Sequence, residues 1–234
     1  MQQNLISAVI LSVGIAVGGY FIGNGIIKFK FSERMVTVKG MAEQIVSSDQ
    51  ATWNVRYAFS SDTLADLYTG ILNSQEQVKK FMLAQGFSEK EIELQAVSVT
   101  DNQNNAYAPA NEKVKRYVAD SGVTVTTGKI EQAKLAVQKT LELINAGIIV
   151  NSSNISYEYT KLNEIKSKIL DEATANAKKT ALSFATNSNN KLGKIKSASQ
   201  GQISIGESNP SGMSSEWSVN KTVRIVTTVT YLLD

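Results

Sequence analysis

An uncharged stretch near the start of the chain constrains the fold more than any other feature. Residues 5–27 contain no Asp, Glu, Lys or Arg. A helix rises about 1.5 Å per residue, so this stretch can cross a hydrocarbon layer of about 30 Å. We therefore predict a membrane anchor whose apolar side chains include Leu5, Ile10, Val13, Phe21 and Ile27.

A cleaved signal peptide is the alternative interpretation of the same stretch. The apolar region of a signal peptide usually spans only about 7–15 residues and precedes a small-x-small cleavage site. Here the stretch is longer and runs without such a site into Lys28-Phe29-Lys30. These features favour a retained anchor. They also separate a short anchor and linker, residues 1–34, from the rest of the chain.

Four glycines in the predicted anchor are spaced for helix contact. Gly14 and Gly18 are four residues apart, and so are Gly19 and Gly23. Small residues at this spacing allow two helices to approach closely in a membrane. Glycine is also common in membrane helices for other reasons. The glycines therefore indicate either self-association of the anchor or simply the usual glycine content of a membrane helix.

The remaining chain, residues 35–234, alternates strands with helices. Strict alternation over residues 50–60 predicts a strand that buries Ala51, Trp53, Val55, Tyr57 and Phe59. Helical periodicity predicts three helices, and the other periodic segments predict strands in the order β-β-α-β-β-α-β-α-β-β. The first predicted helix follows residues 61–62 and stops at Gly86, and the other two are 129–146 and 162–186. The other predicted strands are 35–39, 91–100, 113–127, 148–160, 194–198, 202–205 and 221–232. This order predicts one α+β domain with helices packed on a mostly antiparallel sheet.

Several details follow from the same patterns. Ser61 or Asp62 is expected to cap the first helix, and Gly86 to end it. The third helix presents an alanine stripe, which suits close packing on a sheet. Both faces of residues 221–232 are rich in β-formers, so this strand is expected at the centre of its sheet.

The composition argues against several function classes. The chain has no Cys and no His, which excludes thiol catalysis and removes the most common general base and metal ligand. Its net charge is +3, without a basic run, so no nucleic-acid partner is indicated. We find no phosphate-binding loop. We therefore predict a non-enzymatic protein with no catalytic, cofactor-binding or metal-binding residues.

Several other residues are expected to have structural roles and no role in binding or catalysis. Gly40 and Gly201 are expected in turns with positive φ, and Asp49 is expected to cap a turn. Glu91 and Glu93 are expected on one solvated strand face.

Two polar loops offer candidate contact surfaces. They cover residues 102–111 and 206–218, and the second contains Trp217. Trp217 is either an exposed contact residue or a side chain packed under its loop.

Four groups of residues, in order along the chain, resemble the SIMPL (DUF541) family. The first group is Val-Thr-Val-Lys-Gly-Met-Ala-Glu at 36–43 with Asp-Gln-Ala-Thr-Trp at 49–53. Residues 173–179 follow, then Leu-Gly-Lys-Ile at 192–195 with Ala-Ser-Gln-Gly at 198–201, and finally residues 223–231. The resemblance covers about residues 35–233.

The resemblance implies a bacterial envelope protein that builds large ring- or channel-like homo-oligomers, with links to stress responses in some members. It implies no catalytic residue. We therefore expect an inner-membrane protein with a periplasmic domain, acting as a homo-oligomeric scaffold. Lys28, Lys30 and Arg34 favour the opposite orientation by the positive-inside rule. A stress-linked module that binds a protein or a small ligand through the two loops is the alternative function.

Overall fold

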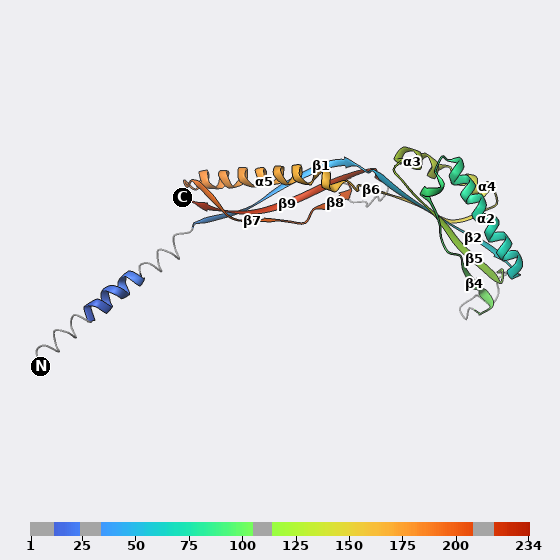
Figure 1. Ribbon diagram of the computed structural model, residues 1–234, viewed down its shortest axis with the longest axis horizontal. Helices are drawn as coiled ribbons and strands as arrows, with labels where there is room; N and C mark the ends of the chain where they lie inside the picture. Colours follow the sequence, from blue (N-terminus) through green and yellow to red (C-terminus); the bar gives the residue numbers. More distant parts are fainter. Residues whose placement is uncertain (1–11, 24–33, 105–113, 208–217) are drawn as a thin grey trace, which may run out of the picture. The chain divides into compact units, whose positions relative to one another are not determined.

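The computed structural model describes residues 12–23, 34–104, 114–207 and 218–234 (Figure 1). The chain divides into two compact units. Unit 1 comprises Met1–Glu43, Lys166–Ser204 and Arg224–Asp234, and unit 2 comprises Gln44–Ile165 and Ile205–Val223. The α+β class is confirmed, but the described strands form two sheets where the sequence suggested one. Element order alone does not specify which strands pair, and the prediction of one domain over residues 35–234 stays a prediction.

Residues 12–23 form a helix whose side chains are largely exposed. Val13 is 56% exposed and Phe21 is 70% exposed. Within the described ranges, no helix combines the length and the apolar character needed to cross a membrane. The predicted span, 5–27, extends beyond this helix on both sides, and Leu5, Ile10 and Ile27 lie outside the described residues. The anchor therefore stays a prediction.

Unit 2 is built on a sheet with the strand order β3-β5-β2-β6, in which β4 also pairs with β5. The pairings are antiparallel. The strands are β2 (Gln50–Ser61), β3 (Ile92–Leu94), β4 (Ser98–Asp101), β5 (Tyr117–Thr127) and β6 (Ile149–Glu158). The strand predicted at 50–60 is confirmed, because its apolar row Ala51, Trp53, Val55 and Tyr57 is fully buried.

Three helices cover one face of this sheet: α2 (Leu64–Ala84), α3 (Ile130–Gln138) and α4 (Leu141–Asn145) (Figure 1). The buried stripe of α2 packs on the β2 row and forms the core of unit 2. Trp53 anchors this core through edge-to-face contacts with Phe81 and Phe87, with ring centroids 6.2 and 6.1 Å apart. Such aromatic contacts stabilise a core beyond the effect of buried area.

The helix ends differ in detail from the prediction. Thr63, rather than Ser61 or Asp62, caps α2, because its Oγ1 accepts a hydrogen bond from the Asp66 backbone at 3.2 Å. Gly86 ends the helix with φ of 88°, as predicted.

The helix predicted at 129–146 is two helices, interrupted at Lys139 and Thr140. The backbone N–H groups of these residues bond to the carbonyls of Ala136 and Val137, three residues back, instead of four. The Thr140 hydroxyl also donates to the Val137 carbonyl at 2.6 Å. A threonine hydroxyl that competes for backbone groups in this way disturbs the helical ladder.

A second sheet, most of whose residues belong to unit 1, has the strand order β1-β9-β7, and β8 also pairs with β9. The strands are β1 (Met35–Ser47), β7 (Leu192–Gln200), β8 (Ser204–Glu207) and β9 (Asn220–Leu233). The central position predicted for residues 221–232 is confirmed. One face of the sheet is covered by α5 (Leu162–Asn187), whose buried residues include Ala173, Ala177 and Ala181 (Figure 1).

Gly40 and Gly201 lack a side chain because another backbone segment lies close to them, and not because of a positive φ. Gly86 and Gly147 are the described glycines with positive φ, so the turn prediction is wrong for both Gly40 and Gly201. A Cβ on Gly40, within β1, would overlap the backbone of Ala173 and Ala177. A Cβ on Gly201 would lie 2.6 Å from the Val226 carbonyl oxygen. Close backbone approach explains both positions.

Candidate ligand pocket

Lys221 is a lysine in a row of buried side chains. Burial alternates along β9, and Lys221 shares its face with Val223 and Ile225, which are fully buried. Lys221 itself is only 7% exposed. None of the described residues forms a hydrogen bond or an ion pair with its ammonium. Among the described residues the buried polar side-chain atoms without a partner are Ser48 Oγ, Tyr57 Oη and Thr227 Oγ1, so the Lys221 stem is buried while its ammonium is accessible to a ligand.

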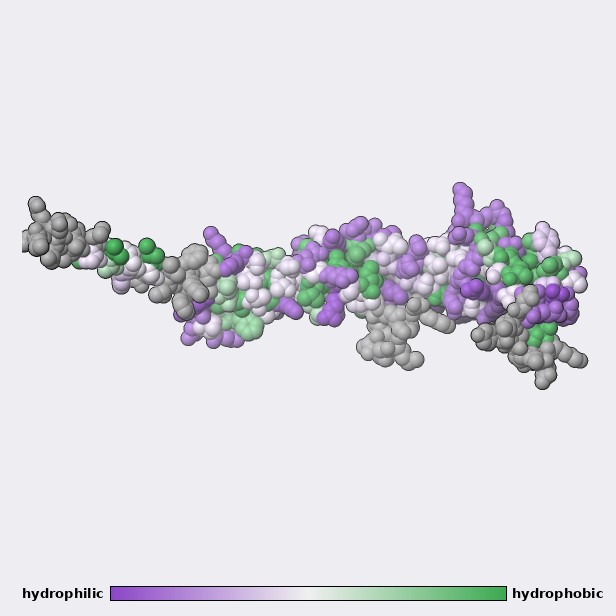
Figure 2. All heavy atoms as spheres, turned by 90° about the horizontal axis from the view of Figure 1, so that it is seen from below, coloured by the Kyte–Doolittle hydropathy of each residue, from purple (hydrophilic) through white to green (hydrophobic). Residues whose placement is uncertain are grey.

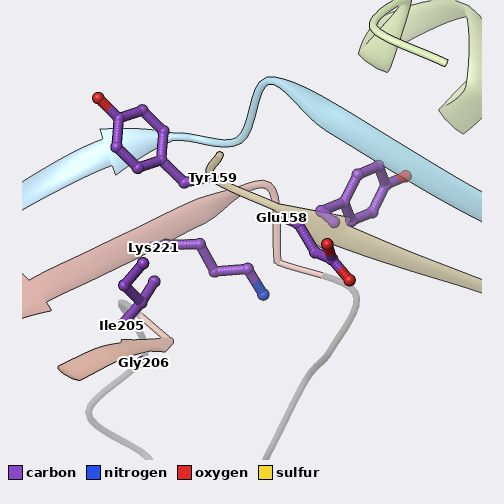
Figure 3. A pocket seen from close by; sticks show the side chains of 6 residues that line it. Glu158, Tyr159, Ile205, Gly206 and Lys221 are labelled. Atoms are coloured by element: carbon purple, nitrogen blue, oxygen red, sulfur yellow. The ribbon is translucent and has the colours of Figure 1, made fainter. Parts of the chain in front are cut away.

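A pocket of about 410 Å³ surrounds this lysine within unit 2. The lining residues come from β6, the segment after it, β8 and the start of β9: Tyr157, Glu158, Tyr159, Ile205, Gly206 and Lys221. Figure 3 shows that the Lys221 and Glu158 side chains extend into the same space, while the Tyr159 ring points away from it. The pocket thus presents one cationic and one anionic group that make no ion pair with each other.

Asp49 fixes the strand ends that carry these two groups. Its carboxylate accepts hydrogen bonds from the Thr160 backbone N–H at 2.8 Å and from the Thr160 hydroxyl at 3.1 Å. Its own N–H donates to the Glu158 carbonyl at 3.0 Å, and the Ser48 N–H donates to the Val219 carbonyl at 2.8 Å. The predicted turn role of Asp49 agrees with these bonds, and it positions the pocket indirectly.

Tyr157 contributes a neutral, apolar wall. It is 5% exposed and pairs with Ala51 across the sheet. Burial raises the pKa of its hydroxyl, and the nearby negative charge of Glu131 raises that pKa further. The hydroxyl therefore stays protonated at neutral pH.

A second pocket, of about 400 Å³, lies within unit 1 between α5 and β7. Lys178 is the charged residue among the described lining residues, and the walls are mostly aliphatic: Thr174, Ala175, Lys178, Leu182, Leu192, Gly193, Ile195 and Tyr231. Because it lacks a charge pair, this pocket offers less chemical selectivity than the one around Lys221.

The residues predicted to act in contacts are only partly described. A Cβ added at Gly14, Gly18, Gly19 or Gly23 would meet no atom within 4 Å. All four positions are therefore free of close contacts, and the prediction that they pack against another helix is untested. Trp217 lies outside the described residues, as do 105–111 of the first predicted contact loop and 208–217 of the second.

Glu91 is a structural residue, not part of a solvated pair with Glu93. It ends a short 3₁₀ helix, η1 (Glu89–Glu91), whereas Glu93 lies in β3. Its carboxylate accepts bonds from the Ser88 backbone at 2.7 Å, the Thr127 hydroxyl at 2.6 Å and the Lys129 ammonium at 3.1 Å. These bonds, the one from the Ser88 backbone first, lower the pKa of Glu91 to about 2.

Lys221 was not predicted as a site residue, although its position in the strand pattern indicates burial. Lys221 is separated from Val223, Ile225 and Val229 by even numbers of residues, so strand alternation alone places it on the same, buried face. Glu158 and Ile205 carried no comparable signal, because only the fold brings them to Lys221. Over the described ranges no group of three or more acidic, His or Cys side chains is arranged to hold a metal ion.

A comparison with models of protein families identifies the family of the chain. A sequence model of the SIMPL family matches residues 36–231. The chain belongs to the SIMPL family. That family is described as a protein of unknown function (DUF541). A comparison with curated proteins gave no match. All six residues of the Lys221 pocket lie within the SIMPL match, while the helix at 12–23 precedes it.

Proposed function

We propose that this SIMPL protein is a non-enzymatic envelope protein, anchored in the bacterial inner membrane, that assembles with copies of itself into a ring, cage or channel-like scaffold. The surface of the helix at 12–23 carries this proposal. Its apolar side chains are exposed (Figure 2), and its four glycines have empty surroundings. Lipid and a second copy of the same helix are the environments that would cover such a surface.

A second apolar surface on unit 2 supports the same proposal. Leu64, Tyr68 and Leu72 follow one line along α2 and are 56%, 67% and 41% exposed. On α4, which contacts α2, Leu141 and Ile144 are 69% and 54% exposed. Exposed apolar patches of this kind mark protein interaction sites.

Pairing at an edge of the sheet that contains β9 would use β1 or β7, because β9 itself is not an edge strand. β9, which contains residues 221–232, lies between β1 and β7. Among the described strands β1 and β7 lie at the two ends of this order, and the pairing register of β7 with β9 shifts twice between Leu192 and Ser197. Irregular edges carrying lysines, such as Lys194 and Lys196, resist strand addition.

Mass photometry on the full-length chain in mild detergent tests the scaffold. We expect a large, uniform particle for the wild type. The double variant Gly14→Leu, Gly18→Leu should reduce particle mass if assembly depends on the helix, because the branched side chains keep the helices apart. Ala16→Leu, which lies off the line of the two glycines, is the matched control. A monomeric wild type would contradict the scaffold proposal.

The membrane orientation is a separate part of the proposal. We place residues 35–234 in the periplasm, against the positive charges at Lys28, Lys30 and Arg34. Protease added to spheroplasts should then degrade the domain. Full protection with an intact inner membrane would place it in the cytoplasm.

A stress-linked binding module is the alternative function. The observation that favours it is the pocket around Lys221, a concave site with opposite charges and apolar walls. A monomeric particle that binds a small molecule would support this alternative over the scaffold.

A further inference from the structure

We propose that the pocket around Lys221 binds a small zwitterion of the amino-acid or dipeptide class, with its carboxylate on Lys221 and its ammonium on Glu158. The inference rests on the alternative function, the binding module, and specifies the ligand chemistry of that site.

The carboxylate half of the assignment comes from Lys221. Its side chain is more than nine-tenths buried, it is directed into the pocket (Figure 3), and no described residue pairs with it. A lysine ammonium is a compact donor of three hydrogen bonds, so an anion is the group that would complete its surroundings. Bound at this position, a ligand carboxylate would be shielded from water, where a charge-assisted hydrogen bond is strong.

The ammonium half comes from Glu158. This carboxylate enters the same pocket from β6 and makes no ion pair with Lys221. It would repel a ligand that carries only negative charge, such as inorganic phosphate. A ligand with opposite charges at its two ends satisfies both side chains at once, so the pair selects for a zwitterion.

The remaining walls set the size and the polarity of the ligand. A volume of about 410 Å³ lies within the range of about 300–1,000 Å³ found for small-molecule sites. Ile205 and the protonated Tyr157 give apolar surface for a short side chain. Gly206 has no atom within 4 Å of an added Cβ, so open space lies beside it.

Two dipeptides that differ in a single charge test the proposal. Alanylalanine carries both charges, and N-acetyl-alanylalanine carries only the carboxylate. We titrate each into the full-length chain in mild detergent and follow binding by ligand-observed NMR. The wild type should bind alanylalanine at least tenfold more tightly than the acetylated form.

Two pocket variants separate the two charges. Lys221→Met should weaken alanylalanine binding at least tenfold. Glu158→Gln, on an exposed residue whose replacement leaves the core intact, should bring the affinities of the two dipeptides within about twofold of each other. Lys178→Met, the same substitution in the second pocket, should bind like the wild type. Circular dichroism on each variant checks that it is folded.

Three results would overturn the proposal. They are no binding of either dipeptide to the wild type, binding that survives both pocket variants, or equal binding of the two dipeptides. If neither dipeptide binds, and if Lys221→Met and Glu158→Gln both lower the free energy of unfolding in a non-additive way, the two residues pair with each other in solution. Particle mass is measured in parallel, so failure of this site is distinguishable from failure of the scaffold proposal.

Discussion

At the scale of single residues, two charged side chains have opposite relations to the fold. Glu91 satisfies its carboxylate with donors from Ser88, Thr127 and Lys129 and joins the end of η1 to the end of β5. Lys221 has no such partners among the described residues. The first residue therefore stabilises unit 2, and the second places a charge where the fold gains nothing from it.

The pKa of Glu91 predicts an acid-sensitive contribution to stability. Its pKa falls from 4.5 to about 2 on folding. A lowered pKa stabilises the fold fully above the unfolded value, so this contribution should disappear as the pH falls from about 4.5 towards 2. Glu91→Gln should cost about 1–2 kcal/mol at pH 7 and less at pH 3, allowing for partial screening by solvent. Urea unfolding at both pH values measures this, with the exposed Glu93→Gln as control; equal losses at both pH values would contradict it.

Replacing Lys221 with an apolar residue should stabilise the protein. Lys221→Met keeps the buried stem and removes an ammonium without a partner among the described residues, so the free energy of unfolding should rise by up to about 1 kcal/mol. Urea denaturation of the full-length chain gives the change. A loss of stability of the same size would show that the ammonium has a structural partner, and the pocket would lose its main argument.

At the scale of elements, sequence patterns predicted where the strands and helices lie, but not which elements pack against one another. Alternation at 50–60 and at 221–232 predicted β2 and β9, because each strand buries one whole row of side chains. Gly40 and Gly201 were misassigned, because a glycine required by a close neighbour looks the same in sequence as one required by positive φ. The pocket escaped prediction for a related reason, since Glu158 and Lys221 are joined only by the fold.

The contact between β1 and α5 predicts that even a methyl group at Gly40 is harmful. A Cβ there would overlap backbone atoms of Ala173 and Ala177, and a helix backbone cannot yield as a side-chain end can. Gly40→Ala should lower the free energy of unfolding by about 2–3 kcal/mol in urea denaturation.

Gly128→Ala provides the matched control for this prediction. A Cβ at Gly128 would lie at an ordinary distance of 3.5 Å from the Asp49 carbonyl oxygen. Its effect should be below about 1 kcal/mol. If Gly40→Ala were as mild as this control, α5 could not lie as close to β1 as described.

At the scale of the whole molecule, the two units differ in how they draw on the chain. Unit 2 takes most of its residues from one long segment, Gln44–Ile165, whereas unit 1 combines Met1–Glu43, Lys166–Ser204 and Arg224–Asp234. The centre of the unit 1 sheet is β9, which pairs with β1 and β7. Unit 1 therefore depends on contacts between residues that are far apart in sequence.

Removing residues 224–234 should affect the two units unequally. Unit 1 would lose its central strand, while the neighbours of Trp53 in unit 2, Phe81 and Phe87, stay in place. In a Trp217→Phe background, the fluorescence of Trp53 should remain blue-shifted, while strand signal in circular dichroism falls. A red-shifted Trp53 would show that unit 2 cannot fold without unit 1.

The pairing of β1 with β9 also sets the order of events during biosynthesis. β1 is translated before its partner strand β9, and most of unit 2 is made between them. Until β9 emerges, the nascent chain carries β1 with its backbone donors and acceptors unsatisfied, a state prone to mispairing with other nascent chains.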